Sequence, residues 1–290
     1  MMHLDGTTSF ITGAAHGIGL GIARSLARQG SRLALADLDR PALGAAAAEL
    51  AELTQVEAFE LDVRDRDAYA RVADEAEARL GPVSVLCNNA GIAFSEVLDD
   101  TTYRLWDLVL GINLGGVVNG VQTFLPRMLD RGAPAHIVNT ASAAGLIGAG
   151  VGCMYTTSKF AVVGLSESLR HQLGTAGHPV GVTVLCPGGV STNLARTARS
   201  LVGAEPGVGA RVERTAPQIE AMLQRHGADP GAVGDQVVDA IRNDRLYVLT
   251  DRAGIDLVTR RTDAILAAMP ADGRTDAGLD DLRRAAREVP

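Results

Sequence analysis

The feature that most constrains the fold is a series of short apolar runs separated by longer stretches of helical periodicity. The runs at residues 83–87, 136–138 and 180–185 are mostly apolar, with little alternation between apolar and polar side chains. This pattern is typical of strands in a parallel sheet whose two faces are both covered by helices. The helical stretches lie at residues 41–53, 68–80, 103–119 and 154–173. The alternation predicts an α/β fold, a Rossmann-type doubly wound parallel sheet in three layers, α/β/α, with right-handed crossovers.

Length and composition agree with one domain. Of the 290 residues, 47% are hydrophobic, which is enough for a sheet covered on both faces. We expect a single domain over residues 1–270 and a polar tail over residues 271–290. Residues 193–230 are rich in Gly, Ala and Arg and are expected to form a mobile substrate lid. A last helix is expected at residues 255–269, with an apolar stripe that packs against a partner subunit or, alternatively, covers the mouth of the site.

Charge and cysteine usage restrict the partners and the location of the protein. The net charge of −7 argues against nucleic acid as a partner, because no basic face stands out. The sequence shows no secretory signal after Met1, and no apolar segment is expected to reach membrane-spanning length. The three cysteines, Cys87, Cys153 and Cys186, lack the spacing of metal ligands. We therefore expect reduced thiols, no metal site and a cytoplasmic protein.

A glycine-rich turn near the N-terminus predicts a phosphate-binding site. Residues 7–12 read as a strand, Gly13, Gly17 and Gly19 follow, and an apolar helical pattern begins at Leu20. Glycines allow a tight turn and the close approach of a pyrophosphate to the helix N-terminus, where free N–H groups favour anions. The spacing is G-x-x-x-G-x-G and differs from the commoner G-x-G-x-x-G. The alternative is an ordinary glycine-rich turn between a strand and a helix.

Asp37 ends the second predicted strand, at residues 31–36, eighteen residues after Gly19. A carboxylate at this place accepts hydrogen bonds from both hydroxyls of an adenosine ribose and repels a 2′-phosphate, so we expect NAD rather than NADP. The alternative is that Asp37 caps the helix that begins near Arg40. His16 and Arg40 are the side chains that would tolerate a 2′-phosphate.

Tyr155, Lys159 and Ser142 form the candidate centre for proton transfer. Tyr155 and Lys159 are four residues apart, so on a helix they share a face, and Ser142 lies thirteen residues upstream after an apolar run. The Lys159 ammonium is expected to lower the pKa of the Tyr155 phenol below about 10, which would let the phenol exchange a proton with an alcohol or a ketone. Ser142 would hold the same oxygen. Alone, Y-x-x-x-K is a common pattern of solvated helix faces.

In this order, the motifs resemble the classical short-chain dehydrogenase/reductase family over about residues 5–250. The resemblance implies that Asn113, Ser142, Tyr155 and Lys159 are the four catalytic residues. Besides Tyr155 and Lys159, it implies these cofactor-binding residues: Gly13, His16, Gly17, Ile18, Gly19, Asp37, Asp62, Val63, Asn89, Ala90, Gly91, Pro187, Gly188, Val190 and Thr192. In the family pattern Asp62 and Val63 lie against the adenine ring, and residues 187–192 hold the nicotinamide carboxamide.

The resemblance also implies the role of each catalytic residue. Tyr155 exchanges a proton with the substrate oxygen, Ser142 donates a hydrogen bond to that oxygen, and Lys159 hydrogen-bonds the nicotinamide ribose. Asn113 resembles the residue that positions a water molecule for proton relay. The alternative for Asn113 is an asparagine that bonds its own helix backbone.

The resemblance implies an oxidoreductase that transfers a hydride between NAD(H) and a small-molecule secondary alcohol or ketone. The wall residues expected at 92–95, 143–150, 153–154 and after Thr192 are mostly small or aliphatic, which favours an apolar, alicyclic substrate. Two alternatives remain: an NADPH-dependent ketoreductase, including one for carrier-bound 3-oxoacyl substrates, and an NAD-sensing protein without turnover. A homodimer or homotetramer is expected, joined through the helices at 103–119 and 154–173, because both are apolar around more than one face.

Overall fold

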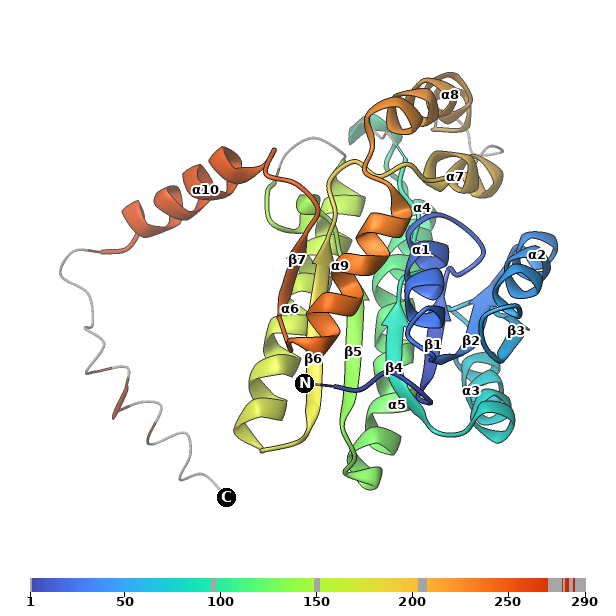
Figure 1. Cartoon of the computed structure of the whole chain (residues 1–290). Coiled ribbons are helices and arrows are strands. Elements are labelled where there is room, and N and C mark those ends of the chain that lie inside the picture. The colour runs from blue at the N-terminus through green and yellow to red at the C-terminus, as the bar shows by residue number, and fades with distance from the viewer. Residues whose placement is uncertain are drawn as a thin grey trace. The chain divides into compact units, whose positions relative to one another are not determined.

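The computed structural model describes residues 2–94, 98–148, 152–202 and 208–270, together with residues 278, 280, 281 and 284. Its central feature is a seven-stranded sheet with the order β3-β2-β1-β4-β5-β6-β7, in which all neighbouring strands are parallel (Figure 1). The strands are β1 (Thr8–Thr12), β2 (Arg32–Asp37), β3 (Val56–Glu60), β4 (Val83–Asn88), β5 (Ala135–Thr140), β6 (Val180–Cys186) and β7 (Tyr247–Leu249). The predicted doubly wound parallel sheet is confirmed.

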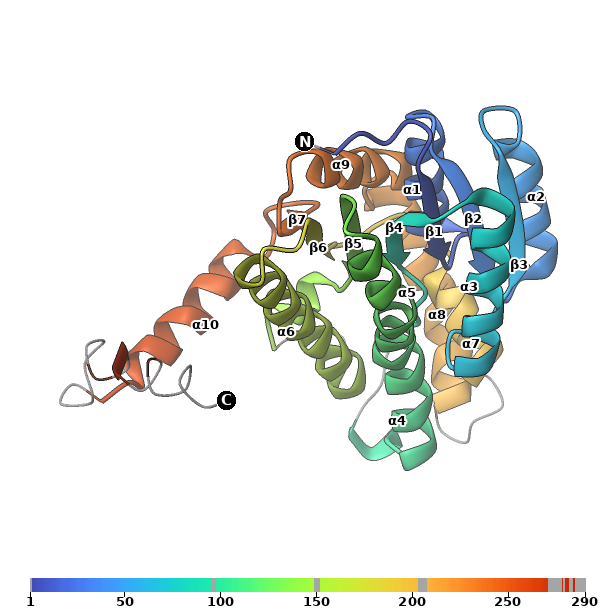
Figure 2. The same cartoon turned by 90° about the horizontal axis from the view of Figure 1, so that it is seen from below.

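Helices cover both faces of this sheet, as Figure 2 shows. One face carries α1 (Gly17–Ala27), α2 (Arg40–Leu50) and α9 (Pro230–Arg242). The other carries α3 (Arg66–Leu80), α5 (Gly116–Arg131) and α6 (Cys153–Thr175). Strands β1 and β5 are buried along their whole length, and β4 is buried except at Ser84, which explains why their sequences lack the alternation of a half-exposed strand. The three predicted layers are therefore present.

Side-chain caps fix where several helices begin. Asp39 caps α2, Asp65 caps α3 and Asp229 caps α9, each by accepting a hydrogen bond from a backbone N–H in the first turn of its helix. A proline follows the cap of α2 and of α9, where its missing N–H costs nothing.

Two helices of one layer touch backbone to backbone. A Cβ added at Gly21 of α1 would lie 2.0 Å from the carbonyl oxygen of Pro230, and one added at Gly234 of α9 would lie 2.2 Å from the carbonyl oxygen of Gly21. Both positions therefore require glycine, since any side chain would collide with main-chain atoms. The contact fixes the start of α9 against the helix that follows the glycine-rich turn.

The helix predicted at residues 103–119 continues to Arg131. It consists of α4 (Tyr103–Leu110), a π-helical turn η2 (Gly111–Gly115) and α5, with Pro126 inside the last part. This continuous helix, Tyr103–Arg131, has the length and mean hydropathy of a membrane span, so the expectation that no segment reaches that length was wrong. Half of its most apolar window is buried within the protein, as in a core helix, and α5 lies against the sheet (Figure 2).

After β6, the chain forms α7 (Leu194–Val202) and α8 (Val208–His226) before it returns to α9. The two helices pack on each other, and α7 buries Ala195, Ala198 and Val202. Short 3-10 turns lie at Leu98–Asp100 (η1) and Ala143–Gly145 (η3).

By its contacts, the chain divides into two compact units, Met1–Arg252 and Ala253–Pro290. The second unit contains α10 (Ile255–Ala267), which has no buried residue among those described; Leu266 is 56% exposed and Ile265 is 45% exposed.

Candidate active site

A cavity of about 600 Å³ opens at the carboxyl edge of the sheet. Residues that follow six different strands line it: Gly13 after β1, Asp37 at the end of β2, Leu61 after β3, Ala90 after β4, Ala141 after β5 and Pro187 after β6. Parallel strands bring their carboxyl ends to one edge, so residues far apart in sequence meet there. This is the position expected for a ligand in an open doubly wound sheet.

The glycine-rich turn is shaped by close backbone contacts. Gly13 has φ +65°, and a Cβ there would lie 2.9 Å from the Cα atom of Ala90. A Cβ at Gly19 would lie only 2.0 Å from the carbonyl oxygen of Gly13. Gly19 therefore does not line the cavity; it allows α1 to pack tightly under the turn. His16, the N-cap residue of α1, forms no side-chain cap, so the N–H groups of the first turn remain available to an anion.

Asn89 and Thr12 hold the turn against the ends of two neighbouring strands. The Thr12 hydroxyl accepts hydrogen bonds from the backbone N–H groups of Asn89 (3.0 Å) and Ala90 (3.1 Å). The Asn89 amide donates to the carbonyl oxygens of Thr12 and Gly13, both at 3.2 Å. The floor of the cavity is thus preorganised by the protein's own polar groups.

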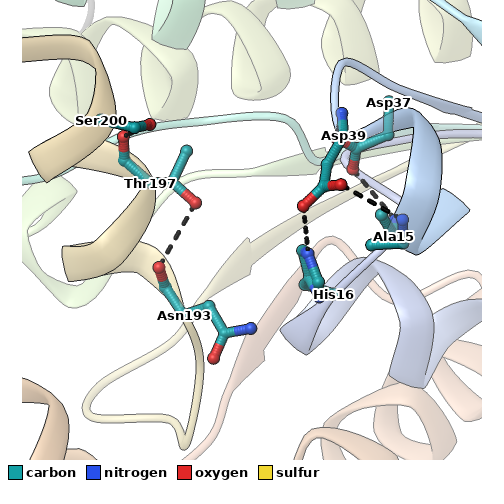
Figure 3. A network of polar contacts seen from close by, with 8 residues as sticks. Ala15, His16, Asp37, Asp39, Asn193, Thr197 and Ser200 are labelled. Atoms are coloured by element: carbon teal, nitrogen blue, oxygen red, sulfur yellow. Dashed lines mark hydrogen bonds and ion pairs between the residues drawn. The ribbon is translucent and has the colours of Figure 1, made fainter.

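Asp37 lies at the far end of this cavity with its carboxylate fixed by the backbone (Figure 3). One oxygen accepts a hydrogen bond from the N–H of Ala15 and the other from the N–H of Asp39, each at 3.0 Å. The carboxylate that caps α2 belongs to Asp39. The alternative in which Asp37 caps this helix was therefore wrong, and the sequence signal for the correct cap is the Asp39-Arg40-Pro41 order.

The two side chains considered for a 2′-phosphate are placed differently. His16 lines the cavity, and its Nε2 atom lies 2.9 Å from Oδ2 of Asp39 (Figure 3). Arg40 does not line the cavity; its side chain is 83% exposed and lies 3.8 Å from the carboxylate of Glu60. The Arg40 side chain therefore lies outside the described cavity, and only His16 of the two reaches it.

Ser142, Tyr155 and Lys159 meet at the other end of the cavity, and all three line it. Tyr155 and Lys159 share a face of α6, as their spacing predicts, with the Lys159 ammonium 5.6 Å from the centre of the Tyr155 ring. The Nζ atom of Lys159 donates a hydrogen bond to the carbonyl oxygen of Thr140 at 3.0 Å. Lys159 is only 4% exposed, so this donor group is almost fully removed from bulk water.

Burial is the largest influence on the pKa values of Tyr155 and Lys159. Desolvation raises the pKa of Tyr155 above its usual value, and a hydrogen bond with Ser142 opposes that rise. Desolvation also lowers the pKa of Lys159 to about 8. The expected net lowering of the phenol pKa was wrong for the cofactor-free protein, because burial disfavours the phenolate by more than a neighbouring ammonium favours it.

Asn113 lies beside this group but outside the cavity lining, in the π-helical turn η2. Its fully buried amide accepts a hydrogen bond from the N–H of Ile92 (2.8 Å) and donates to the carbonyl oxygen of Ile92 (3.0 Å) and to the hydroxyl of Ser158 (3.1 Å). The alternative in which Asn113 bonds its own helix backbone does not match these contacts. The side chain joins the chain after β4 to α6, next to Tyr155.

The other predicted cofactor-binding residues reach the cavity. These residues are Gly17, Ile18, Asp62, Val63, Asn89, Ala90, Gly91, Pro187, Gly188, Val190 and Thr192. The Asp62 carboxylate is already engaged by Arg64, at 2.6 Å, and this contact lowers its pKa.

Sequence reasoning missed Thr140, Ala15 and Asp39 as parts of the site. It expected substrate walls from residues 143–148 and from Cys153 and Met154, which do not line the cavity. Residues 95, 149 and 150 of the expected walls lie outside the described residues. The apolar wall comes from the other two expected segments: Ile92, and Leu194, Leu201 and Leu223 after Thr192 in α7 and α8.

The parallel sheet and the cavity at its carboxyl edge define an oxidoreductase that binds a nicotinamide cofactor. The sequence profile described as short chain dehydrogenase matches residues 7–202. The chain belongs to the short chain dehydrogenase family.

Several known proteins are similar over most of the chain. The C alpha-dehydrogenase of Sphingobium sp. (strain NBRC 103272 / SYK-6) is 34% identical, over 86% of this chain and 82% of that protein. The 1-deoxy-11-beta-hydroxypentalenate dehydrogenase of Streptomyces avermitilis is 36% identical, over 86% of each chain. The crystal structure of a short chain dehydrogenase/reductase from Burkholderia phymatum in complex with NAD aligns with a TM-score of 0.84 and 34% identity, over 95% of this chain and 100% of that one.

Proposed function

We propose that the protein transfers a hydride between NAD(H) and an uncharged secondary alcohol or ketone of apolar, alicyclic character. The observation that carries this proposal is a single cavity with Asp37 at one end and Ser142, Tyr155 and Lys159 at the other. A dinucleotide has an adenosine ribose at one end and a reactive ring at the other. Its site therefore needs a ribose-binding group at one end and catalytic groups at the other.

The cavity fits the dinucleotide on three observations. The Gly13 and Gly17 positions have positive φ and leave no room for a side chain, so main-chain atoms can approach a pyrophosphate. The N-terminus of α1 favours its negative charge. The fixed Asp37 carboxylate keeps lone pairs for ribose hydroxyls and disfavours a 2′-phosphate, which supports NAD over NADP. When bound, the nicotinamide ring supplies or accepts the hydride.

The proton chemistry is assigned to the chain's own residues. In reduction, the Tyr155 phenol gives its proton to the carbonyl oxygen of the substrate; in oxidation, the phenolate takes the proton of the alcohol. The Ser142 hydroxyl donates a hydrogen bond to the same oxygen as negative charge grows on it. The buried ammonium of Lys159 stabilises the phenolate by its charge, and Asn113 fixes α6 by holding Ser158. The raised pKa of Tyr155 keeps the phenol protonated in the cofactor-free protein.

The substrate end of the cavity supports an apolar ligand. Ile92, Leu194, Leu201 and Leu223 supply apolar side chains to the cavity lining. The similar proteins from Sphingobium and Streptomyces are named as dehydrogenases, one of them of a hydroxypentalenate. We also propose a cytoplasmic location, which the three free cysteines support.

The test is a screen of secondary alcohols and ketones with NAD(H) and NADP(H), followed at the nicotinamide absorbance. Turnover with NAD(H) that is lost in Tyr155→Phe supports the proposal. Tight NADH binding without turnover of any alcohol or ketone would instead favour a sensor of the cofactor.

A further inference from the structure

Arg196 is placed at the cofactor end of the cavity by the first turn of α7. The preceding Thr192 packs on the glycine-rich turn so closely that a Cβ added at Gly17 would lie 2.8 Å from its Cγ2 atom. Helix α7 then begins at Leu194, and Arg196 is the arginine that lines the cavity among the residues described. The segment following β6 therefore carries a permanent positive charge to the place where α1 begins.

The positive charge of Arg196 acts on Asp39, two residues after Asp37. The pKa of Asp39 is lowered, chiefly by its hydrogen bond with His16 and in smaller part by the charges of His16 and Arg196. Figure 3 shows the α7 segment, with Asn193, Thr197 and Ser200, facing His16, Asp37 and Asp39. Arg196 thus lies near enough to Asp39, the N-cap residue of α2, for its charge to act on that carboxylate.

Among the residues that the structure describes, no carboxylate forms an ion pair with this guanidinium. Within the described ranges, Arg196 forms no hydrogen bond and no ion pair within 4.0 Å. Arg199, one turn further along α7, differs: its guanidinium contacts Glu213 through two hydrogen-bonding pairs, at 2.8 and 2.6 Å, and it does not line the cavity. The two arginines share a helix, but only Arg196 is left to meet a ligand.

We propose that Arg196 is a further cofactor-binding residue, whose guanidinium binds the pyrophosphate of the dinucleotide from the side opposite the N-terminus of α1. The inference rests on the proposed NAD(H) function and adds a binding group to it. Arginine suits this role because its planar donors match phosphate oxygens. The binding would also link α7 to the cofactor, and α7 carries Leu201 of the apolar wall.

The rival role for Arg196 is recognition of a carboxylate on the substrate. Its proximity to Asp39 and to the start of α1 argues against this role, since both lie at the end of the cavity remote from Tyr155. A 2′-phosphate on the cofactor is a second rival. The three roles differ in which ligand loses affinity when the charge is removed.

Isothermal titration of the full chain with ADP-ribose and with adenosine tests the proposal without any substrate. Arg196→Gln should weaken ADP-ribose binding about five- to tenfold, the usual weight of one charge-assisted hydrogen-bonding group, and leave adenosine binding unchanged. Arg196→Lys should recover part of the loss. Arg199→Gln removes the same charge from the same helix and should leave ADP-ribose affinity unchanged. The loss should shrink at high ionic strength.

Several results would overturn the inference. If Arg196→Gln bound ADP-ribose as tightly as the unsubstituted protein does, Arg196 would not bind the pyrophosphate. The proposed NAD(H) function would be unaffected by that result. A loss confined to NADPH would assign Arg196 to a 2′-phosphate, and a change confined to the KM of an acidic substrate would assign it to the substrate. If the unsubstituted protein bound neither ADP-ribose nor NADH, both the inference and the proposed function would fail.

Discussion

The ammonium of Lys159 lies 5.6 Å from the centre of the Tyr155 ring; Lys159 is buried and Tyr155 is partly buried, so water screens their charges little. Each charged form is therefore disfavoured by burial, and the phenolate and the ammonium depend on each other. This relationship sets the pH range in which the pair can act.

The first prediction concerns that pH range. With the pKa of Lys159 lowered to about 8, its ammonium loses the proton as the pH rises through 8. Because the raised pKa keeps Tyr155 protonated there, kcat/KM for ketone reduction should be highest below pH 8 and fall above it. In Lys159→Arg the side chain stays charged, so this fall should move to higher pH even if the absolute rate is lower. A fall that stays near pH 8 in Lys159→Arg would contradict the assignment.

The second prediction concerns the proton donor. Tyr155→Phe keeps the ring and removes the hydroxyl, so turnover should decrease by about 100-fold or more. The affinity for NADH, measured by titration, should change little. Lys159→Ala should reduce both turnover and cofactor affinity, since Lys159 is proposed to serve both. Near-full activity of Tyr155→Phe on a good substrate would rule out the proposed mechanism.

The third prediction is a preference for NADH over NADPH that depends on Asp37. Asp37→Ala removes a charge next to the position of a 2′-phosphate and should narrow the affinity gap by about tenfold. Asp65→Asn is the matched control, because it removes an equal charge outside the cavity lining and keeps a cap on α3. Fluorescence titration with NADH and with NADPH measures the difference between the two affinities. Equal or tighter binding of NADPH by the unsubstituted protein would refute the preference.

The fourth prediction is that alanine has opposite effects on stability at two glycine positions, because their surroundings differ. In Gly19→Ala the new Cβ would collide with the carbonyl oxygen of Gly13, so we expect a loss of about 1–3 kcal/mol in the free energy of unfolding and weaker NADH binding. Gly44, inside α2, has nothing within 4 Å of its Cβ position. Gly44→Ala should therefore stabilise the protein by roughly 0.5–1 kcal/mol. Denaturant unfolding of both variants checks the contrast, and equal effects would contradict it.

The fifth prediction is a homodimer or homotetramer, which we propose on the apolar character of α4 and α6. Within one chain, Tyr103 of α4 is 90% exposed, while Trp106, Leu108 and Leu165 remain only partly buried. Contact with a second copy would remove this surface from water. Light scattering at several micromolar concentrations should give a multiple of the 30.2 kDa chain mass. A mass of one chain at all concentrations would disprove it.

Much of the fold could be predicted because its signals are local. The buried strands β4, β5 and β6 read directly as apolar runs, and their observed ends differ from the predicted ends by one or two residues. The candidate site followed from the same logic, since each motif comes just after a strand and the carboxyl ends of parallel strands meet at one edge.

What could not be predicted depends on tertiary structure. Arg196 comes from a segment with no recognisable motif, and only the fold brings it near Asp39. Whether the pKa of Tyr155 is raised or lowered depends on how completely water is excluded from the phenol. The i, i+4 spacing of Tyr155 and Lys159 carries no information about that exclusion. The π-helical turn around Asn113 could not be predicted from the sequence either, because its residues continue the apolar periodicity of the helix on either side.

The close contacts of α1 have a consequence for how this protein can be altered. Thr192 packs on Gly17 at the start of that helix, and Pro230 packs on Gly21 one turn later. Both ends of the intervening segment, with α7 and α8, are therefore anchored to the same rigid support. Between these anchors, the length and sequence of the segment can change to select another substrate while the helix under the cofactor keeps its place, provided that Arg196 and the Asp229 cap are retained.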